Sequence, residues 1–226
     1  MTRFRFLTGM LLVCIVTATG AEAAKKSARP AEPMAQDTSL DNLKDAPKPS
    51  VLACEGPFAK DTAHDKLVAA FGVKNVTFKD VDVTSNVLTK ATVLFDADPT
   101  RRLVVFWKDE KTRTRPLAIT VDAPSTWIGP GGVRNGLTLR ELEKLNGGNF
   151  SVTGFGGIGG GEASKLGGPF VNLPGDCSLK IRFEPGIASP LPPRFSSVTG
   201  DVLIVSTNLI LRRVRPQVVQ WSINYR

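Results

Sequence analysis

The segment that most constrains the fold is 136–161, which combines a helix signal, a glycine stop, a strand signal and a glycine-rich turn. Three leucines recur at every third position, the spacing of one apolar helix face: Leu139, Leu142 and Leu145. Thr138 precedes them, and Glu141 follows Thr138 by three positions, which is the capping-box pattern of a helix start. Gly147 and Gly148 then end the helix, because glycine accepts the left-handed backbone of a C-cap.

A glycine-rich turn follows the strand positions Phe150 and Val152. Its residues are Phe155, Gly156, Gly157, Ile158, Gly159, Gly160 and Gly161. One interpretation is a wide hairpin whose glycines accept positive φ angles. The other is a binding loop, since binding residues concentrate on loops that a rigid scaffold holds in place. We treat these residues as a candidate binding loop.

The glycines Gly154, Gly156 and Gly159 also match the spacing of a dinucleotide-binding fingerprint. That fingerprint must join a strand to a long helix. The segment 162–170 is short and contains two glycines and a proline, so it does not predict such a helix. We therefore expect no cofactor.

The N-terminal residues 1–23 have the pattern of a secretory signal peptide. Arg3 and Arg5 form a basic start, an apolar run follows, and cleavage is expected after Ala23. Residues 24–50 are rich in proline, alanine and lysine, which predicts a flexible tether. The expected location is periplasmic or secreted, with no transmembrane segment in the mature chain.

Two cysteines, Cys54 and Cys177, remain after the expected cleavage. Two cysteines in an exported chain predict one disulfide bond. Two buried free thiols are the alternative.

The first half of the expected domain shows one helix and four strands. The helix spans 62–71, with Leu67, Ala70 and Phe71 on its apolar side and Gly72 at its end. Strand-like apolar runs separated by polar turns occur at 75–83, 91–95, 103–107 and 117–121.

The second half begins with the helix of the constraining segment and is less regular. Apolar positions follow at 169–173, 178–183 and 202–205. Residues 206–214 suggest a helical turn capped by Ser206 or Thr207. Residues 217–225 alternate cleanly, with four apolar residues expected on one face of a strand: Val219, Trp221, Ile223 and Tyr225.

Both halves share a pattern of leucine, apolar residue, glycine stop, asparagine and strand start, at 67–76 and 142–150. This similarity favours a degenerate tandem repeat. We therefore expect an α+β domain at 51–226 with two helix-plus-antiparallel-sheet halves, at about 51–125 and 133–226. The helices should pack on one sheet face.

The sequence shows no catalytic constellation or metal cluster. His64 is the only histidine and lies beside Asp61 and Asp65, which favours a surface position. The spacing of His64, Cys54 and Cys177 matches no zinc pattern. We expect no catalytic residue and no metal site.

Paired carboxylates for glycan hydrolysis are an open alternative, because any two acids can converge in a folded chain. Three lie nearest to the glycine-rich turn: Glu141, Glu143 and Glu162. Glu141 is better explained as a capping partner, and Glu143 as a solvated helix position. Asp96 and Asp98 are interpreted as turn formers, since a calcium loop's glycine and distal glutamate are absent.

The formal net charge of +8 is compatible with nucleic acid, anionic lipid or an acidic partner. The basic residues are mostly scattered, and the aromatic residues that would stack on bases are not interleaved with them. We therefore expect no nucleic-acid partner.

Four segments resemble motifs of a family of uncharacterised bacterial secreted or periplasmic proteins: 67–76, 91–95, 105–109 and 136–156. The similar motifs are a helix ending in Phe-Gly-x-x-Asn, a Thr-Val-Leu-Phe strand, and a Leu-Glu-x-Leu-Asn-Gly block followed by Gly-Phe-Gly. The resemblance covers about residues 54–225 and implies export without a particular activity. More distantly, the layout is similar to the tandem modules of secreted beta-lactamase-inhibitor-like proteins and of a small outer-membrane assembly lipoprotein, which implies protein binding.

These observations favour a non-catalytic periplasmic binding or inhibitor-like module. The expected partner is an envelope protein or a glycan. A passive structural component of the envelope and a carboxylate-based glycan hydrolase are the alternatives.

Overall fold

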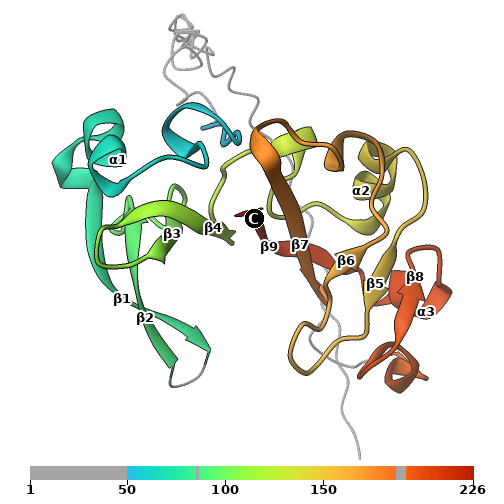
Figure 1. Cartoon of the computed structure of the whole chain (residues 1–226). Coiled ribbons are helices and arrows are strands. Elements are labelled where there is room, and N and C mark those ends of the chain that lie inside the picture. The colour runs from blue at the N-terminus through green and yellow to red at the C-terminus, as the bar shows by residue number, and fades with distance from the viewer. Residues whose placement is uncertain (1–49, 85–86, 187–191) are drawn as a thin grey trace, which may run out of the picture. The chain divides into compact units, whose positions relative to one another are not determined.

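The computed structural model describes residues 50–84, 87–186 and 192–226, and Figure 1 shows how their helices and strands are arranged. The predicted signal peptide 1–23 and the predicted tether up to residue 49 lie outside the described residues. None of the described helices is long and apolar enough to cross a membrane.

An antiparallel sheet of six strands forms the larger part of the fold (Figure 1). Its first four strands form a meander: β1 (Val76–Thr84), β2 (Val87–Leu94), β3 (Leu103–Asp109) and β4 (Thr114–Asp122). β9 (Gln217–Tyr225) pairs with β4, and β7 (Cys177–Glu184) pairs with the other side of β9. The strand order is therefore β1-β2-β3-β4-β9-β7, with the last strand in sequence between two earlier ones.

A smaller antiparallel sheet has the order β6-β5-β8. Its strands are β5 (Ser151–Thr153), β6 (Ala163–Ser164) and β8 (Leu203–Val205). The three α-helices are α1 (His64–Phe71), α2 (Leu139–Asn146) and α3 (Leu209–Arg213). Short 3-10 turns interrupt the loops, among them η5 (Gly168–Phe170) and η6 (Pro174–Asp176).

The α+β class is confirmed, whereas the tandem repeat is not. The six-stranded sheet takes four strands from the first expected half and two from the second. Leu67 of α1, Leu142 of α2 and the strand residues Ile119 and Trp221 all belong to one buried cluster. The two halves therefore share one sheet and one core.

Helix α2 has the predicted capping box. The Thr138 backbone N–H donates to Glu141 Oε2 at 2.8 Å, and the Glu141 N–H donates to Thr138 Oγ1 at 3.3 Å. Leu139 and Leu142 are buried. Gly147 ends the helix in the left-handed conformation with φ of 75°. Local sequence thus specifies this helix from cap to cap.

Helix α1 begins later than predicted, because the residues at its start pair with the end of the β3–β4 turn and the first residues of β4. The Arg115 N–H donates to Thr62 O, and the His64 N–H donates to Arg113 O, both at 2.9 Å. The expectation that Ala70 lies on the apolar side is wrong. Val68 instead packs against the core.

Helix α3 is capped by Asn208 rather than by Ser206 or Thr207. Asn208 Oδ1 accepts hydrogen bonds from the backbone N–H groups of Ile210 and Leu211, at 2.8 and 3.0 Å. The Ser206 hydroxyl donates to Glu143 Oε1 at 2.6 Å, so it is engaged elsewhere.

The alternation predicted for β9 holds for Trp221, Ile223 and Tyr225, which are buried. It fails at Val219, which is only partly buried, while Val218 is buried. The pairing with β7 shifts register at this point, so that Val218 rather than Val219 faces the core. A bulge of this kind changes the side-chain alternation.

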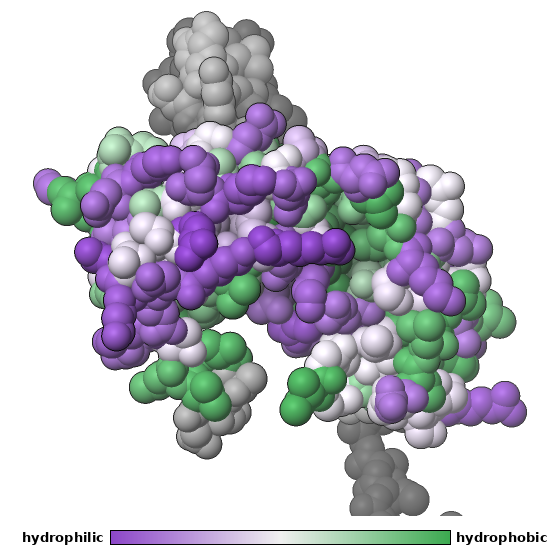
Figure 2. All heavy atoms as spheres, viewed as in Figure 1, coloured by the Kyte–Doolittle hydropathy of each residue, from purple (hydrophilic) through white to green (hydrophobic). Residues whose placement is uncertain are grey.

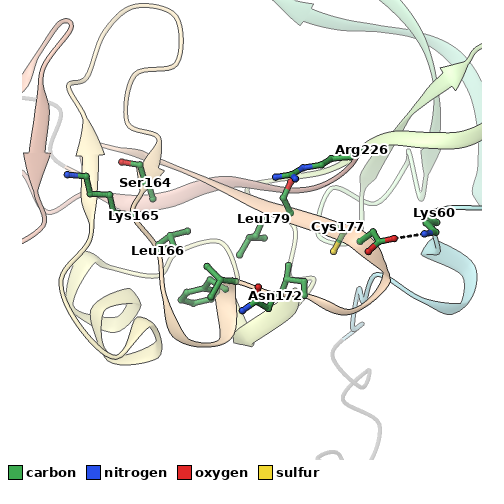
Figure 3. Close-up of a pocket in the computed structure, with 14 residues that line it drawn as sticks. Lys60, Ser164, Lys165, Leu166, Asn172, Cys177, Leu179 and Arg226 are labelled. Atoms are coloured by element: carbon green, nitrogen blue, oxygen red, sulfur yellow. Dashed lines mark hydrogen bonds and ion pairs between the residues drawn. The ribbon is translucent and has the colours of Figure 1, made fainter.

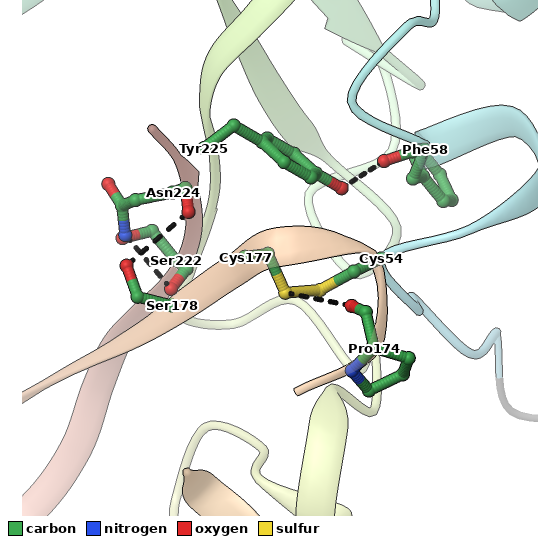
Figure 4. The surroundings of a disulfide bond; sticks show 8 residues. All are labelled: Cys54, Phe58, Pro174, Cys177, Ser178, Ser222, Asn224 and Tyr225. Carbon is green, nitrogen blue, oxygen red and sulfur yellow. Dashed lines mark hydrogen bonds between the residues drawn. A yellow bond between two sulfur atoms is a disulfide. The ribbon is translucent and has the colours of Figure 1, made fainter. Parts of the chain in front are cut away.

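The predicted disulfide joins Cys54 to Cys177, whose Cα atoms are 6.2 Å apart (Figure 4). Nearby, the Tyr225 hydroxyl donates to the Phe58 carbonyl oxygen. Burial raises the pKa of this Tyr225 hydroxyl. These contacts connect the segment before α1 to the β7–β9 end of the sheet.

Candidate functional site

The candidate binding loop joins β5 to β6 as a wide hairpin, and Gly156, Gly157, Gly159 and Gly161 have positive φ angles. Thr153 fixes both ends of the hairpin. Its hydroxyl donates to Gly159 O at 2.6 Å and accepts from the Glu162 N–H at 2.8 Å. The Gly161 N–H donates to Thr153 O at 3.1 Å. The sequence does not single out Thr153, because its role depends on the closed hairpin.

Gly161 fixes this hairpin against the large sheet. It has a φ of 77°, and an added Cβ would overlap the carbonyl oxygen of Phe183. The Phe183 N–H donates to Gly161 O at 2.8 Å. Gly156 also has a positive φ, of 74°, but an added Cβ would meet nothing within 4 Å there. The two glycines therefore serve the loop differently, one by close packing and one by backbone conformation alone.

A cavity of about 520 Å³ lies beside the loop. Its lining residues come from the loop, β7 and the segment before β8: Phe155, Gly156, Gly157, Gly160, Arg182, Phe183, Glu184, Pro185, Phe195 and Thr199. The rings of Phe155 and Phe195 stack with centroids 6.5 Å apart and an interplanar angle of 7°. Arg182 Nη1 and Glu184 Oε1, 2.5 Å apart, add a charged pair. The cavity therefore combines apolar aromatic surface with one ion pair.

Of the predicted loop residues, four line this cavity, while Ile158, Gly159 and Gly161 do not. Ile158 is fully exposed. Exposure alone does not distinguish it, since Figure 2 also shows hydrophobic residues at the free end of the β1–β2 hairpin, where Val83, Val87 and Leu88 are exposed. The adjoining cavity is what distinguishes the loop.

A second, larger hollow of about 720 Å³ lies beside β6, η5 and the start of β7 (Figure 3). The sequence does not indicate this hollow, because its walls come from segments that the fold brings together. At one end, Lys60 Nζ lies 2.5 Å from Asp176 Oδ2. This hydrogen-bonded ion pair lowers the pKa of Asp176 and raises that of Lys60.

A glycosidase requires two carboxyl groups that flank one bond. Four hollows formed by the described residues are each lined by one acidic side chain: Asp176, Glu162, Glu55 or Glu184.

The expectation that Glu143 is a solvated helix position is wrong. Its carboxylate accepts hydrogen bonds from Arg212 Nη2 at 2.8 and 2.9 Å and from the Ser206 hydroxyl at 2.6 Å. Its side chain is 15% exposed. Glu141 has the expected capping role, and the Thr138 backbone N–H lowers the pKa of its carboxyl.

His64 is partly buried rather than simply a surface residue. Its Nδ1 lies 2.9 Å from Thr92 Oγ1. Burial, with a smaller effect from Arg113, lowers the pKa of His64, and Asp65 opposes the shift. Within the described part of the chain, no three His, Cys, Asp or Glu residues are grouped to hold a metal ion.

Comparisons of this chain with protein-family models, curated proteins and solved structures find no match. The resemblance to bacterial secreted proteins and to beta-lactamase-inhibitor-like modules therefore stays a prediction.

Proposed function

We propose that this chain is an exported, non-catalytic binding module that recognises an envelope protein or a glycan through the loop 155–161. The observation that carries the proposal is the cavity beside that loop, with its stacked Phe155 and Phe195 rings. Apolar aromatic surface with a few polar groups is typical of ligand-binding pockets. Ile158 adds an exposed apolar contact next to it.

Three features support the proposal. Thr153 and Gly161 hold its base through hydrogen bonds to the scaffold. The Cys54–Cys177 disulfide suits an oxidising compartment such as the periplasm. Each of the four hollows formed by the described residues is lined by one acidic side chain, whereas the glycan-hydrolase alternative needs two carboxyl groups.

The test is affinity capture from envelope extract with the chain from Ala24 onward, immobilised through its N-terminal segment. Two variants change an exposed apolar residue to aspartate: Ile158→Asp in the loop, and Val73→Asp as the matched control outside it. We expect one saturable partner. Its affinity should fall at least ~10-fold for Ile158→Asp, because a charge placed in an apolar contact costs more than ~1.4 kcal/mol. The affinity of Val73→Asp should equal that of the wild type.

Equal capture by both variants would remove the loop from the proposal. Absence of any saturable partner, with circular dichroism showing the protein folded, would favour the passive envelope role.

A further inference from the structure

We propose that the hollow beside β6 and β7 binds an extended acidic peptide segment of a partner protein, which adds a strand to the free edge of β7. This site is separate from the loop 155–161 and does not depend on the function proposed for that loop.

Two strand edges lie at this hollow. β7 is the edge strand of the large sheet, and β6 is the edge strand of the small one. They meet at one bridge between Glu162 and Arg182. From Cys177 to Lys180, no described strand pairs with β7 on the side away from β9. An unpaired strand edge is a template for pairing with another chain.

The backbone of β7 offers hydrogen-bonding groups on this side. The Phe183 N–H points away from β9, because it donates to Gly161 O at 2.8 Å. In an antiparallel strand, backbone groups of alternate residues point to the same side. Leu179, four positions earlier, therefore presents its N–H and C=O to the hollow, which it also lines.

The hollow has room and apolar surface for side chains of an added strand. Its volume is about 720 Å³. Apolar lining residues come from β7 and from the loop that faces it: Leu166, Phe170, Leu173 and Leu179. Figure 3 shows Leu166 and Leu179 on different segments around it, with Ser164 on the β6 side. Alternate side chains of a bound strand would face this surface.

The charge of the hollow favours an acidic occupant. Three cationic side chains line it: Lys60, Lys165 and Arg226. Its one acidic lining side chain, Asp176, is paired with Lys60. Neither Lys165 nor Arg226 has a carboxylate partner among the ion pairs of the described residues. The same positive charge disfavours a second copy of this chain, because two such edges would repel each other.

The wall of the hollow also contains an unsatisfied polar group. Ser164 Oγ is buried and has no hydrogen-bond partner among the described residues. Buried hydroxyls are normally hydrogen-bonded. Because this atom is shielded from solvent, a bound peptide reaches it only if the Ser164 side chain rotates toward the hollow.

The test uses two pools of biotinylated eight-residue peptides and the full mature protein. One pool has Asp or Glu at alternate positions with apolar residues between them, and the other has Lys or Arg in place of the acids. We expect only the acidic pool to retain the protein. Lys165→Glu and Arg226→Glu should each weaken retention at least ~10-fold, because each reverses a charge at the site. Lys74→Glu, at an exposed position outside the hollow, should not.

Hydrogen exchange separates strand addition from charge attraction alone. The amide of Leu179 should exchange more slowly in the presence of the acidic pool, because a bound strand accepts its hydrogen bond. Equal retention of both pools, retention of neither, or an unchanged Leu179 amide would overturn the proposal. So would a dimer of this chain that Lys165→Glu abolishes, since the edge would then belong to a second copy.

Failure of this site leaves capture through Ile158 unaffected, so the two proposals are tested separately.

Discussion

The carboxylate of Glu143 is held by Ser206 and Arg212, which follow it by 63 and 69 positions in the chain. Both oxygens of Glu143 accept from Arg212 Nη2, and the Arg212 Nε also donates to Ser206 O at 3.2 Å. The guanidinium side chain is 29% exposed. This ion pair therefore connects helix α2 to helix α3 in a partly dehydrated environment, where charge-assisted hydrogen bonds are strong.

Replacement of Glu143 by glutamine should lower the free energy of unfolding by about 1–3 kcal/mol, because Arg212 loses its charged acceptor. Urea titration followed by circular dichroism measures this change. Lys144→Gln is the control on the same helix and should stay within about 0.5 kcal/mol of the wild type. Equal effects of both substitutions would show that the Glu143–Arg212 pair adds no stability.

His64 should make stability depend on pH between about pH 7.5 and pH 5.5. The pKa of His64 is lowered in the folded state, so the unfolded chain binds the proton more readily. Stability is therefore fully present above the unfolded pKa, near 6.5, and falls as the pH drops through that value. Urea titrations at both pH values should show a smaller decrease for His64→Gln than for the wild type.

An equal decrease in both proteins would assign the pH dependence to carboxyl groups instead. No other histidine contributes to this comparison, because His64 is the only histidine in the chain.

At the scale of elements, the β5–β6 hairpin shows that glycines in one loop can have different structural roles. Gly161 packs against the Phe183 carbonyl, while Gly156 faces open space. Gly161 brings the small sheet to the edge of the large one, because its carbonyl oxygen accepts a hydrogen bond from the Phe183 N–H. Gly156 only allows the chain to turn.

Alanine substitutions should separate these roles. Gly156→Ala should cost about 1–2 kcal/mol, the penalty of a left-handed conformation for a residue with a Cβ. Gly161→Ala should cost about 1–3 kcal/mol more, because its Cβ also overlaps the Phe183 carbonyl. Thermal and urea unfolding measure the difference. Equal losses would mean that the hairpin relaxes away from β7 without cost.

The helices differ in how far their local sequence predicts them. α2 has a capping box, a leucine face and a glycine stop, all within ten residues, so its limits follow from the sequence. The start of α1 does not follow from the sequence, because Thr62 is hydrogen-bonded to Arg115 of β4 and His64 to Arg113 of the β3–β4 turn. The cap of α3 is Asn208 rather than the predicted Ser206 or Thr207, and the Ser206 hydroxyl instead donates to Glu143 on α2.

The glycines in the sequence indicate the candidate loop, but nothing in the sequence indicates the cavity beside it. Phe195 and Arg182, which complete that cavity, lie outside the loop in sequence. The sequence also does not predict the hollow at the β7 edge, because the strand order determines which edges stay unpaired. A repeated helix–glycine–strand pattern is local and carries no information about strand order.

At the scale of the whole molecule, the Cys54–Cys177 disulfide closes a loop of 123 positions. It joins the segment before α1 to the start of β7. In the chain-entropy model, a loop of this length corresponds to about 4–5 kcal/mol of stabilisation.

Thiol labelling of the unreduced, denatured chain from Ala24 should therefore detect no free thiol. The double variant Cys54→Ser/Cys177→Ser should unfold at a lower urea concentration, by about 2–5 kcal/mol in free energy. Reduced wild type is the matched control and should behave like the double variant. Two labelled thiols in the unreduced protein would contradict the bond.

The position of β9 determines when the fold can be completed. β9 follows every other strand in the chain, yet it lies between β4 and β7. The Gln220 side chain of β9 donates a hydrogen bond to Asp122, 98 positions earlier. The Asn224 carbonyl oxygen accepts a hydrogen bond from Ser178, 46 positions earlier. A growing chain that lacks β9 therefore leaves one edge of β4 and one edge of β7 open. Because such long-range pairing is slow, assembly of the large sheet is a late kinetic event, and chains truncated before Gln217 should be the most prone to aggregate through open strand edges.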